Sequence, residues 1–209
     1  MAYPVVSAPY GLLAQNLIGG QVFAGSTRMY NIQYGYATSI FYGDFVVLSR
    51  GFATRASVGT GTGLNQTVGI FLGCTYTNPT TKQKLFSQYW PASTAAGDCQ
   101  AFVLDDPDAL FQIKGSAALG TFNSGTAGSG WPGAIGKNAA LGFGSGGNTT
   151  TGISSFNLVV GSNGGSLAAT STLALRIVDV VRGTESDDYP EFIVKLNVGV
   201  HSYNNSLGV

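Results

Sequence analysis

The chain has 209 residues, of which 44% are hydrophobic and 10% are charged, and its ten Lys and Arg balance ten Asp and Glu. A net charge of zero excludes the basic stripe with which nucleic-acid-binding proteins displace counterions from phosphates. No run reaches the roughly 18 consecutive apolar residues of a membrane-spanning helix, so neither nucleic acid nor a membrane is predicted as a partner. A neutral surface favours a protein that neighbouring molecules cover, the alternative being a neutral secreted β-protein.

Residues 1–27 carry no charged side chain, and Arg28 is the first. No basic region precedes the apolar residues, so this start does not match a secretory signal. Its apolar residues follow neither a helical nor a strand period, and Pro4 and Pro9 favour extended backbone. Because the segment is too apolar for a solvated tail, we expect residues 1–35 to form an extended N-terminal arm on another molecule. A segment folded over its own domain is the alternative.

Short aromatic and β-branched runs, separated by turn residues, predict strands through residues 36–209. The first five are expected at residues 38–49, 66–77, 82–90, 98–106 and 110–113. The run 38–49 is interpreted as a hairpin that turns at Gly43 and Asp44. We expect residues 171–183 and 190–203 to form a long hairpin that completes the sheet begun at residue 38. The predicted fold is all-β, an antiparallel β-barrel or β-sandwich.

Residues 115–170 are rich in Gly, Ser and Thr, but they contain aromatic side chains that a flexible linker lacks. We predict an ordered, loop-rich insertion with Gly-rich excursions and one short helical turn near residues 137–141. Elsewhere, Cys74 and Cys99 lie in strand-like runs. Two cysteines are too few for a disulfide framework, so buried free thiols are expected, with a bridge as the alternative if the two strands are neighbours.

Side chains that carry catalytic or ligand chemistry are scarce. His201 is the single histidine and is expected to be packed or on the surface rather than bound to a metal. Asp105, Asp106 and Asp108 are interpreted as a turn, with Ca²⁺ binding as the alternative. The chain contains no nucleophile elbow and no phosphate loop with the required spacing. No enzyme activity, cofactor or metal site is therefore predicted.

The chain contains seven distinctive stretches, in this order: PYGLLAQNLIGGQVFAGSTRMYNI, GYATSIFYGDFVVL, VGIFLGCTYTNP, FSQYWP, VLDDPDALFQI, LALRIVDVV and VKLNVGVHSYNNSLGV. Together they resemble a family of virion structural proteins of tailed bacteriophages, the capsid cement or decoration proteins, especially those of phages of cyanobacteria. The resemblance implies a β-domain attached at symmetry axes on the outer surface of the phage head. Its implied partners are the major capsid protein and its own copies, as a homotrimer or a homodimer, assembled in the host bacterial cytoplasm.

On this resemblance, the predicted function is to stabilise the shell by bridging major capsid subunits. Buried aromatic and aliphatic side chains dominate such contacts. Interface anchors are therefore expected at seven N-terminal residues: Tyr3, Val5, Tyr10, Leu12, Leu17, Ile18 and Phe23. Arg28 is expected in a hydrogen-bonded pair at the root of the arm.

Two other functions compete with this prediction. One is a carbohydrate-binding module, free or on the virion, or another head- or tail-associated β-module. Tyr89, Trp90 and Trp131 would then supply a stacking platform, because a flat apolar ring beside polar groups suits the face of a pyranose. The other is an enzyme of unrecognised type, for which the sequence offers least.

Overall fold

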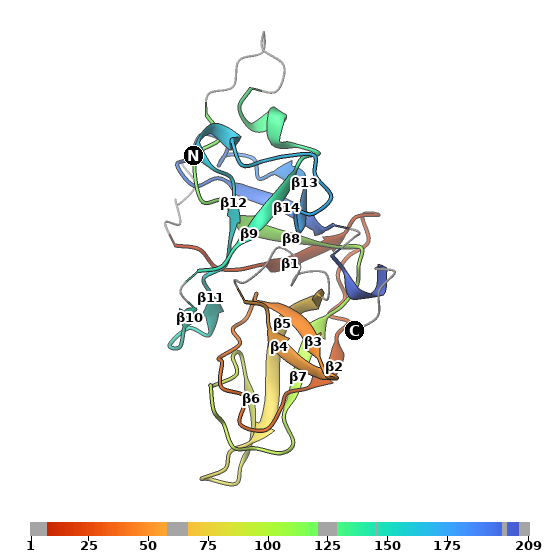
Figure 1. The fold of residues 1–209 in the computed structure, drawn as a ribbon, viewed down its shortest axis with the longest axis vertical. Helices are drawn as coiled ribbons and strands as arrows, with labels where there is room; N and C mark the ends of the chain where they lie inside the picture. Colours follow the sequence, from red (N-terminus) through yellow and green to blue (C-terminus); the bar gives the residue numbers. More distant parts are fainter. Residues whose placement is uncertain (1–7, 58–66, 121–128, 145, 198–199, 205–209) are drawn as a thin grey trace.

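The computed structural model describes residues 8–57, 67–120, 129–144, 146–197 and 200–204. These residues form two six-stranded antiparallel sheets and a two-stranded ribbon. The two sheets lie one above the other along the longest axis of the molecule (Figure 1). The all-β prediction is confirmed. Of the two architectures expected, sandwich-like packing fits, because neither sheet closes into a barrel within the described residues.

Sheet I fills the upper half of Figure 1 and sheet II the lower half. The strands of sheet I are, in spatial order, β1 (Leu13–Leu17), β8 (Ala109–Lys114), β14 (Glu191–Leu196), β13 (Leu175–Val180), β9 (Asn138–Gly142) and β12 (Asn157–Val159). The strands of sheet II are β2 (Arg28–Asn31), β7 (Gln100–Leu104), β5 (Thr67–Thr77), β3 (Phe45–Ser49) and β4 (Phe52–Arg55), with β6 (Lys84–Ser87) paired to β5. The ribbon joins β10 (Gly147–Asn148) to β11 (Ile153–Ser154), and three 3₁₀ turns complete the set: η2 (Trp131–Ala134), η3 (Ser162–Gly164) and η4 (Ser202–Asn204).

The long C-terminal hairpin is confirmed, but it belongs to a different sheet from the one predicted. In β14, Phe192, Val194 and Leu196 are buried and alternate with half-buried residues, which is the period of a strand with one covered face. β14 pairs with β13 on one side and with β8 on the other. The hairpin therefore forms the centre of sheet I, whereas the strand that follows residue 38 belongs to sheet II.

The predicted hairpin at residues 38–49 is wrong in its pairing. A turn is present at Gly43 and Asp44, where the Asp44 backbone N–H donates to the Phe41 carbonyl at 3.0 Å, but the residues before it do not pair with β3. The strand β3 begins at Phe45 and turns into β4 through Arg50 and Gly51, which both have positive φ angles, of 52° and 84°. Two successive positive φ angles make a two-residue turn whose twist suits a hairpin. The Asp44 carboxylate also accepts a hydrogen bond from the Phe41 backbone N–H at 2.9 Å.

Two hydrophobic cores stabilise the fold. The inter-sheet core joins buried residues of sheet I, such as Phe111 and Phe192, to Phe45, Ile70 and Leu104 of sheet II. The sheet II core lies on the opposite face of the lower sheet. Its buried residues include Phe71, Cys74, Trp90, Cys99 and Ala101. Both cysteines are free and buried, as expected.

A buried ion pair fixes the ribbon to sheet II. The carboxylate of Asp44 is fully buried and lies 2.7 Å from Nε of Arg55. It also accepts a hydrogen bond from Oγ of Ser154 in β11, at 2.5 Å. Burial raises the pKa of Asp44, while Arg55 and the hydrogen bonds from Ser154 and Phe41 oppose that rise. The hydrogen bond from Ser154 to the paired Asp44 therefore holds together two segments that are 110 residues apart in sequence.

The prediction of a separate N-terminal arm is corrected over the residues that the structure describes. β1 pairs with β8 as an edge strand of sheet I, with Leu13 opposite Gln112 and Ala14 opposite Phe111. Leu12 is fully buried in the inter-sheet core. Residues 11–17 thus pack on their own domain, which is the alternative that the sequence left open, whereas residues 18–22 and 24–27 are exposed. Burying Leu12 within the chain removes its side chain from water.

Residues 115–170 supply strands β9 and β12 of sheet I, so the predicted loop-rich insertion contributes to this sheet. The expected helical turn at residues 137–141 is wrong, since this stretch forms most of β9. The turn lies earlier, at Trp131–Ala134, where Pro132 occupies an early helical position that needs no N–H donor.

Candidate interaction surfaces

The predicted interface anchors do not share one surface. Leu12 is buried, and Leu17 and Phe23 pack half-buried against the inter-sheet core. Tyr10 is half-buried at the edge of sheet I, and Ile18 is 50% exposed. Two further anchors, Tyr3 and Val5, lie outside the described residues. Of the anchors that the structure describes, Ile18 alone is an exposed apolar side chain.

Ile18 borders an apolar groove of about 400 Å³ across sheet I. Ile135, Val178 and Leu196 line the same groove, and two cations, Arg176 and Lys195, flank it. Nζ of Lys195 lies 2.6 Å from a carboxylate oxygen of Asp108, and Nε of Arg176 donates to Oδ1 of Asn138 at 2.7 Å. Both cations are thus held by neighbours, and the sheet I groove presents mainly aliphatic surface.

A second apolar surface, the sheet II patch, consists of Met29, Phe86 and Phe102. Phe102 lies between Ala101 and Val103, which both belong to the sheet II core, so its side chain points to the opposite face. Met29 on β2 is in register with Phe102, and the rings of Phe86 and Phe102 stack with centroids 6.5 Å apart. Met29 is 59% exposed and Phe86 is 78% exposed. Contiguous exposed apolar groups of this kind mark interaction sites.

The patch was not predicted, although the sequence contains a signal for it. The run AFVL in β7 has no polar residue, whereas a strand with one solvated face alternates polar and apolar residues. An uninterrupted apolar run indicates a strand that is covered on both faces. One face of β7 is covered by the sheet II core, and Phe102 on the other face is only partly covered.

Arg28 takes part in the predicted pair. Its Nε lies 2.8 Å from a carboxylate oxygen of Asp105, which also accepts a hydrogen bond from the Tyr30 hydroxyl at 3.0 Å. The Tyr30 hydroxyl contacts that of Tyr203 in the turn η4. Burial, together with the hydrogen bonds to Tyr203 and Asp105, raises the pKa of Tyr30. This Arg28 cluster fastens the C-terminal segment to β2 and β7.

His201 is packed inside the protein, which is one of the two locations that the sequence predicted for it. It is buried, and its Nε2 lies 3.2 Å from the backbone oxygen of Asp105. Burial lowers the pKa of His201, because it disfavours the charged imidazolium. The acidic run forms the predicted turn, in which Asp106 accepts a hydrogen bond from the Asp108 backbone N–H at 2.8 Å. No cluster of three or more metal-ligating side chains occurs in the part of the chain that the structure describes.

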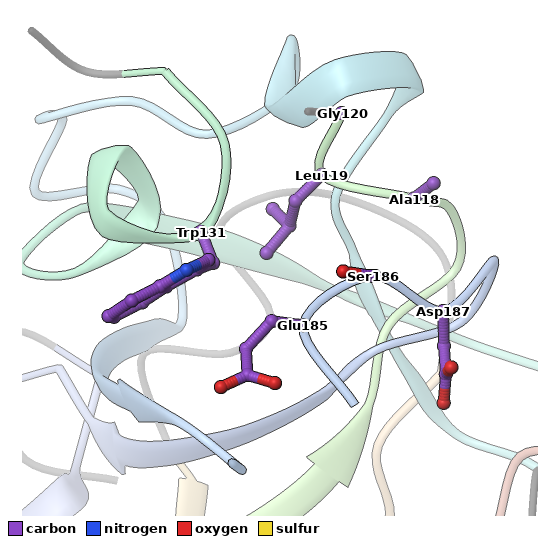
Figure 2. A pocket seen from close by; sticks show the side chains of 7 residues that line it. All are labelled: Ala118, Leu119, Gly120, Trp131, Glu185, Ser186 and Asp187. Carbon is purple, nitrogen blue, oxygen red and sulfur yellow. The ribbon is translucent and has the colours of Figure 1, made fainter. Parts of the chain in front are cut away.

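The two tryptophans differ as possible sugar platforms. Trp90 is fully buried in the sheet II core, so it packs in a core and cannot supply the stacking platform of the alternative function. Trp131 lines a pocket of about 470 Å³ together with Glu185, Ser186 and Asp187 (Figure 2). The guanidinium of Arg182 lies 4.2 Å from the centroid of the Trp131 ring. This cation–π contact already occupies one face of the indole.

Among the described residues, none of the helical segments is long and apolar enough to cross a membrane. Comparison of the chain with protein-family models, with curated proteins and with solved structures returns no match.

Proposed function

We propose that the protein is a structural component of a bacteriophage virion, a capsid decoration protein that binds the outer surface of the head. In this role it bridges major capsid subunits and carries out no catalysis. It also associates with its own copies, as a homotrimer or a homodimer.

One observation carries the proposal: the molecule exposes two separate apolar surfaces, one on each sheet. The sheet I groove presents Ile18 and Ile135, and the sheet II patch presents Met29 and Phe86. The chain has only 20 formally charged side chains in 209 residues, so charge repulsion opposes association only weakly. A protein that joins two neighbours needs two such surfaces, because a single surface can attach it but cannot bridge.

The physical mechanism is linkage. A protein that binds the assembled shell but not its separated subunits stabilises the shell in proportion to its occupancy. When one apolar surface has docked, the second is held near its own partner, which raises the effective concentration of that contact. Two modest contacts then give tight attachment.

The location of β1 determines how the proposal is tested. Deleting residues 1–27 would remove an edge strand and the buried Leu12, so a loss of binding would not separate attachment from folding. Single charged substitutions of exposed residues avoid this problem. We choose Ile18→Asp for the sheet I groove and Phe86→Asp for the sheet II patch. Tyr189→Asp is the matched control, because Tyr189 is exposed but belongs to neither surface.

The measurement is co-sedimentation with expanded empty heads of the virus that encodes the chain, assembled without this protein. We expect each single variant to bind about tenfold more weakly or worse, and the double variant to lose attachment. The control should bind like the unaltered protein. Undiminished attachment of the double variant, with its fold intact by circular dichroism, would refute the proposal.

A further inference from the structure

A polar cleft lies where the edge of sheet I meets the ribbon. It has a volume of about 560 Å³, and five polar side chains line it: Tyr10, Tyr42, Gln88, Gln112 and Glu191. Leu13 and Ile153 complete its wall. This volume is typical of small-molecule sites, which combine apolar walls with a few convergent polar groups.

A second hollow of about 580 Å³ adjoins the first, because Tyr10 and Ile153 line both. Its other lining residues include Asn148, Thr151 and Ser155. The side-chain oxygen of Asn148 accepts hydrogen bonds from the backbone N–H groups of residues 150 and 151, which leaves its amide N–H groups for other partners. Tyr10 thus stands between two hollows that are both lined with hydrogen-bonding groups.

Gln112 fixes the carboxylate of Glu191 within the cleft. Its Nε2 donates to Oε2 of Glu191 at 2.6 Å, and its Oε1 accepts from Nε2 of Gln15 at 3.0 Å. Both ends of the Gln112 amide are therefore engaged within the protein. The other carboxylate oxygen of Glu191 forms no ion pair and no hydrogen bond of normal geometry among the described residues; its neighbour is the Tyr10 hydroxyl, with which a ligand donor would compete.

Three more groups in the cleft have unused hydrogen-bonding capacity. The hydroxyl of Tyr10 is shielded from solvent and makes no hydrogen bond of normal geometry, although it lies near Gln112 and Glu191. Within the described residues, the hydroxyl of Tyr42 and the amide of Gln88 also make no hydrogen bond to the protein. A buried polar group without a partner is costly, and native proteins usually satisfy it with water or a ligand.

Burial and the Glu191 carboxylate raise the pKa of Tyr10, so its hydroxyl keeps its proton at neutral pH. Because the Tyr10 hydroxyl is shielded from solvent, a ligand reaches this donor only when the side chain turns towards the cleft. The cleft itself presents one carboxylate acceptor and two groups that both donate and accept, the Tyr42 hydroxyl and the Gln88 amide. A ligand with several neighbouring hydroxyl groups matches this set, because each hydroxyl donates one hydrogen bond and accepts others. The aliphatic side chains of Leu13 and Ile153 suit the C–H face of such a ligand.

We propose that this cleft is a binding site for a neutral saccharide that spans Tyr10, with one sugar ring in each hollow. The Glu191 carboxylate accepts a hydrogen bond from a sugar hydroxyl and repels acidic sugars and phosphates, because no cationic side chain lines either hollow. The site uses neither Trp90 nor Trp131. It is also independent of the two apolar surfaces, so its failure would leave the proposed structural role untouched.

The test is saturation-transfer NMR on the full chain with four neutral disaccharides: maltose, lactose, cellobiose and N,N′-diacetylchitobiose. Glucuronic acid serves as the acidic comparison. We expect at least one disaccharide to bind with a millimolar or tighter Kd, and glucuronic acid to bind more weakly. Tyr10→Phe removes one hydrogen bond, and Glu191→Gln replaces a charged acceptor with a weaker neutral one, so each should raise that Kd about tenfold. Tyr34→Phe, a change at an exposed tyrosine that does not line the cleft, should leave the Kd unchanged.

Three results would overturn the proposal: no binding of any of the four disaccharides at millimolar concentration, equal binding by Tyr10→Phe and Glu191→Gln, or tighter binding of glucuronic acid. Thermal unfolding of each variant controls for loss of fold. In parallel, Tyr10→Phe should still co-sediment with phage heads, which separates the saccharide site from the attachment surfaces.

Discussion

The two sheets have the same strand number and the same antiparallel pairing, yet they are covered differently. Sheet I packs one face on the inter-sheet core and leaves the other face with half-buried residues such as Val178 and Ile193. Sheet II is covered on both faces near the junction, by the inter-sheet core on one side and by its own core on the other. Its far end then exposes Met29 and Phe86. Sheet II thus combines two covered faces near the junction with an apolar patch that the described residues leave uncovered.

β5 links the two cores, because Ile70 belongs to the inter-sheet core and its neighbour Phe71 to the sheet II core. Two cores that share a strand should unfold together, although each could be disrupted separately.

The largest effect is expected from large-to-small changes in the two cores. Phe111→Ala in the inter-sheet core and Phe71→Ala in the sheet II core should each lower the free energy of unfolding by about 3–5 kcal/mol. Both residues are fully buried, so they form a matched pair. The measurement is urea unfolding followed by tryptophan fluorescence. Trp90 reports on the sheet II core, and Trp131, which packs against the inter-sheet core, reports on the other half.

Single-tryptophan backgrounds, Trp131→Phe and Trp90→Phe, separate the two signals. We expect the two tryptophans to report one common transition in each core variant. If Phe71→Ala shifts the Trp90 transition while the Trp131 transition stays in place, the sheets are independent folding units and the shared strand does not couple them.

A smaller effect is expected at alkaline pH, and it should originate in sheet II. Burial raises the pKa of Cys74 from 9.0 to about 12 and that of Cys99 to about 11. A thiol whose pKa is higher in the folded than in the unfolded state contributes stability below pH 9, and that stability is lost as the pH rises towards the folded value. Between pH 8 and pH 11, Cys74 alone should cost about 2–3 kcal/mol.

Urea unfolding of the unaltered protein and of Cys74→Ala at the two pH values measures this loss. The variant is less stable at pH 8, because it leaves a small cavity, but it should lose less stability on going to pH 11. An equal loss in both proteins would show that other groups, such as the tyrosines, dominate the alkaline response.

Local patterns predicted most strands of this fold, whereas they did not predict which strands share a sheet. The run at residues 66–77 located β5 to within one residue. The period of two at residues 190–203 located the start of β14 to within one residue, but the strand ends at Leu196, seven residues before the predicted end. The assignment of the C-terminal hairpin to sheet I depends on its pairing with β8, a contact between residues about 80 apart in sequence. A local pattern carries no information about such a contact.

The N-terminal segment shows the same limit. Its aperiodic apolar residues were correctly identified as needing cover, but the sequence could not tell whether the cover is another molecule or the chain itself. Leu12 is buried by Gly43 and Phe156, whose backbone oxygens accept hydrogen bonds from Leu12 and Gly11 at 3.1 Å. The cleft around Tyr10 was missed for a related reason, since its polar residues come from five separate segments of the chain.

The smallest change in the free energy of unfolding is expected for a substitution at Tyr10. It distinguishes a residue that stabilises the core from one that serves ligand binding. A buried hydroxyl that makes no hydrogen bond contributes nothing to the folded state and costs its desolvation. Tyr10→Phe removes the hydroxyl and keeps the ring, so we expect stability to stay unchanged or to rise by up to about 1 kcal/mol in urea unfolding. A loss of more than about 1 kcal/mol would mean that the hydroxyl is satisfied in the free protein, by its neighbours Gln112 and Glu191 or by water. A residue whose removal stabilises the fold while weakening saccharide binding is positioned for a ligand, because selection for stability alone would not retain its hydroxyl.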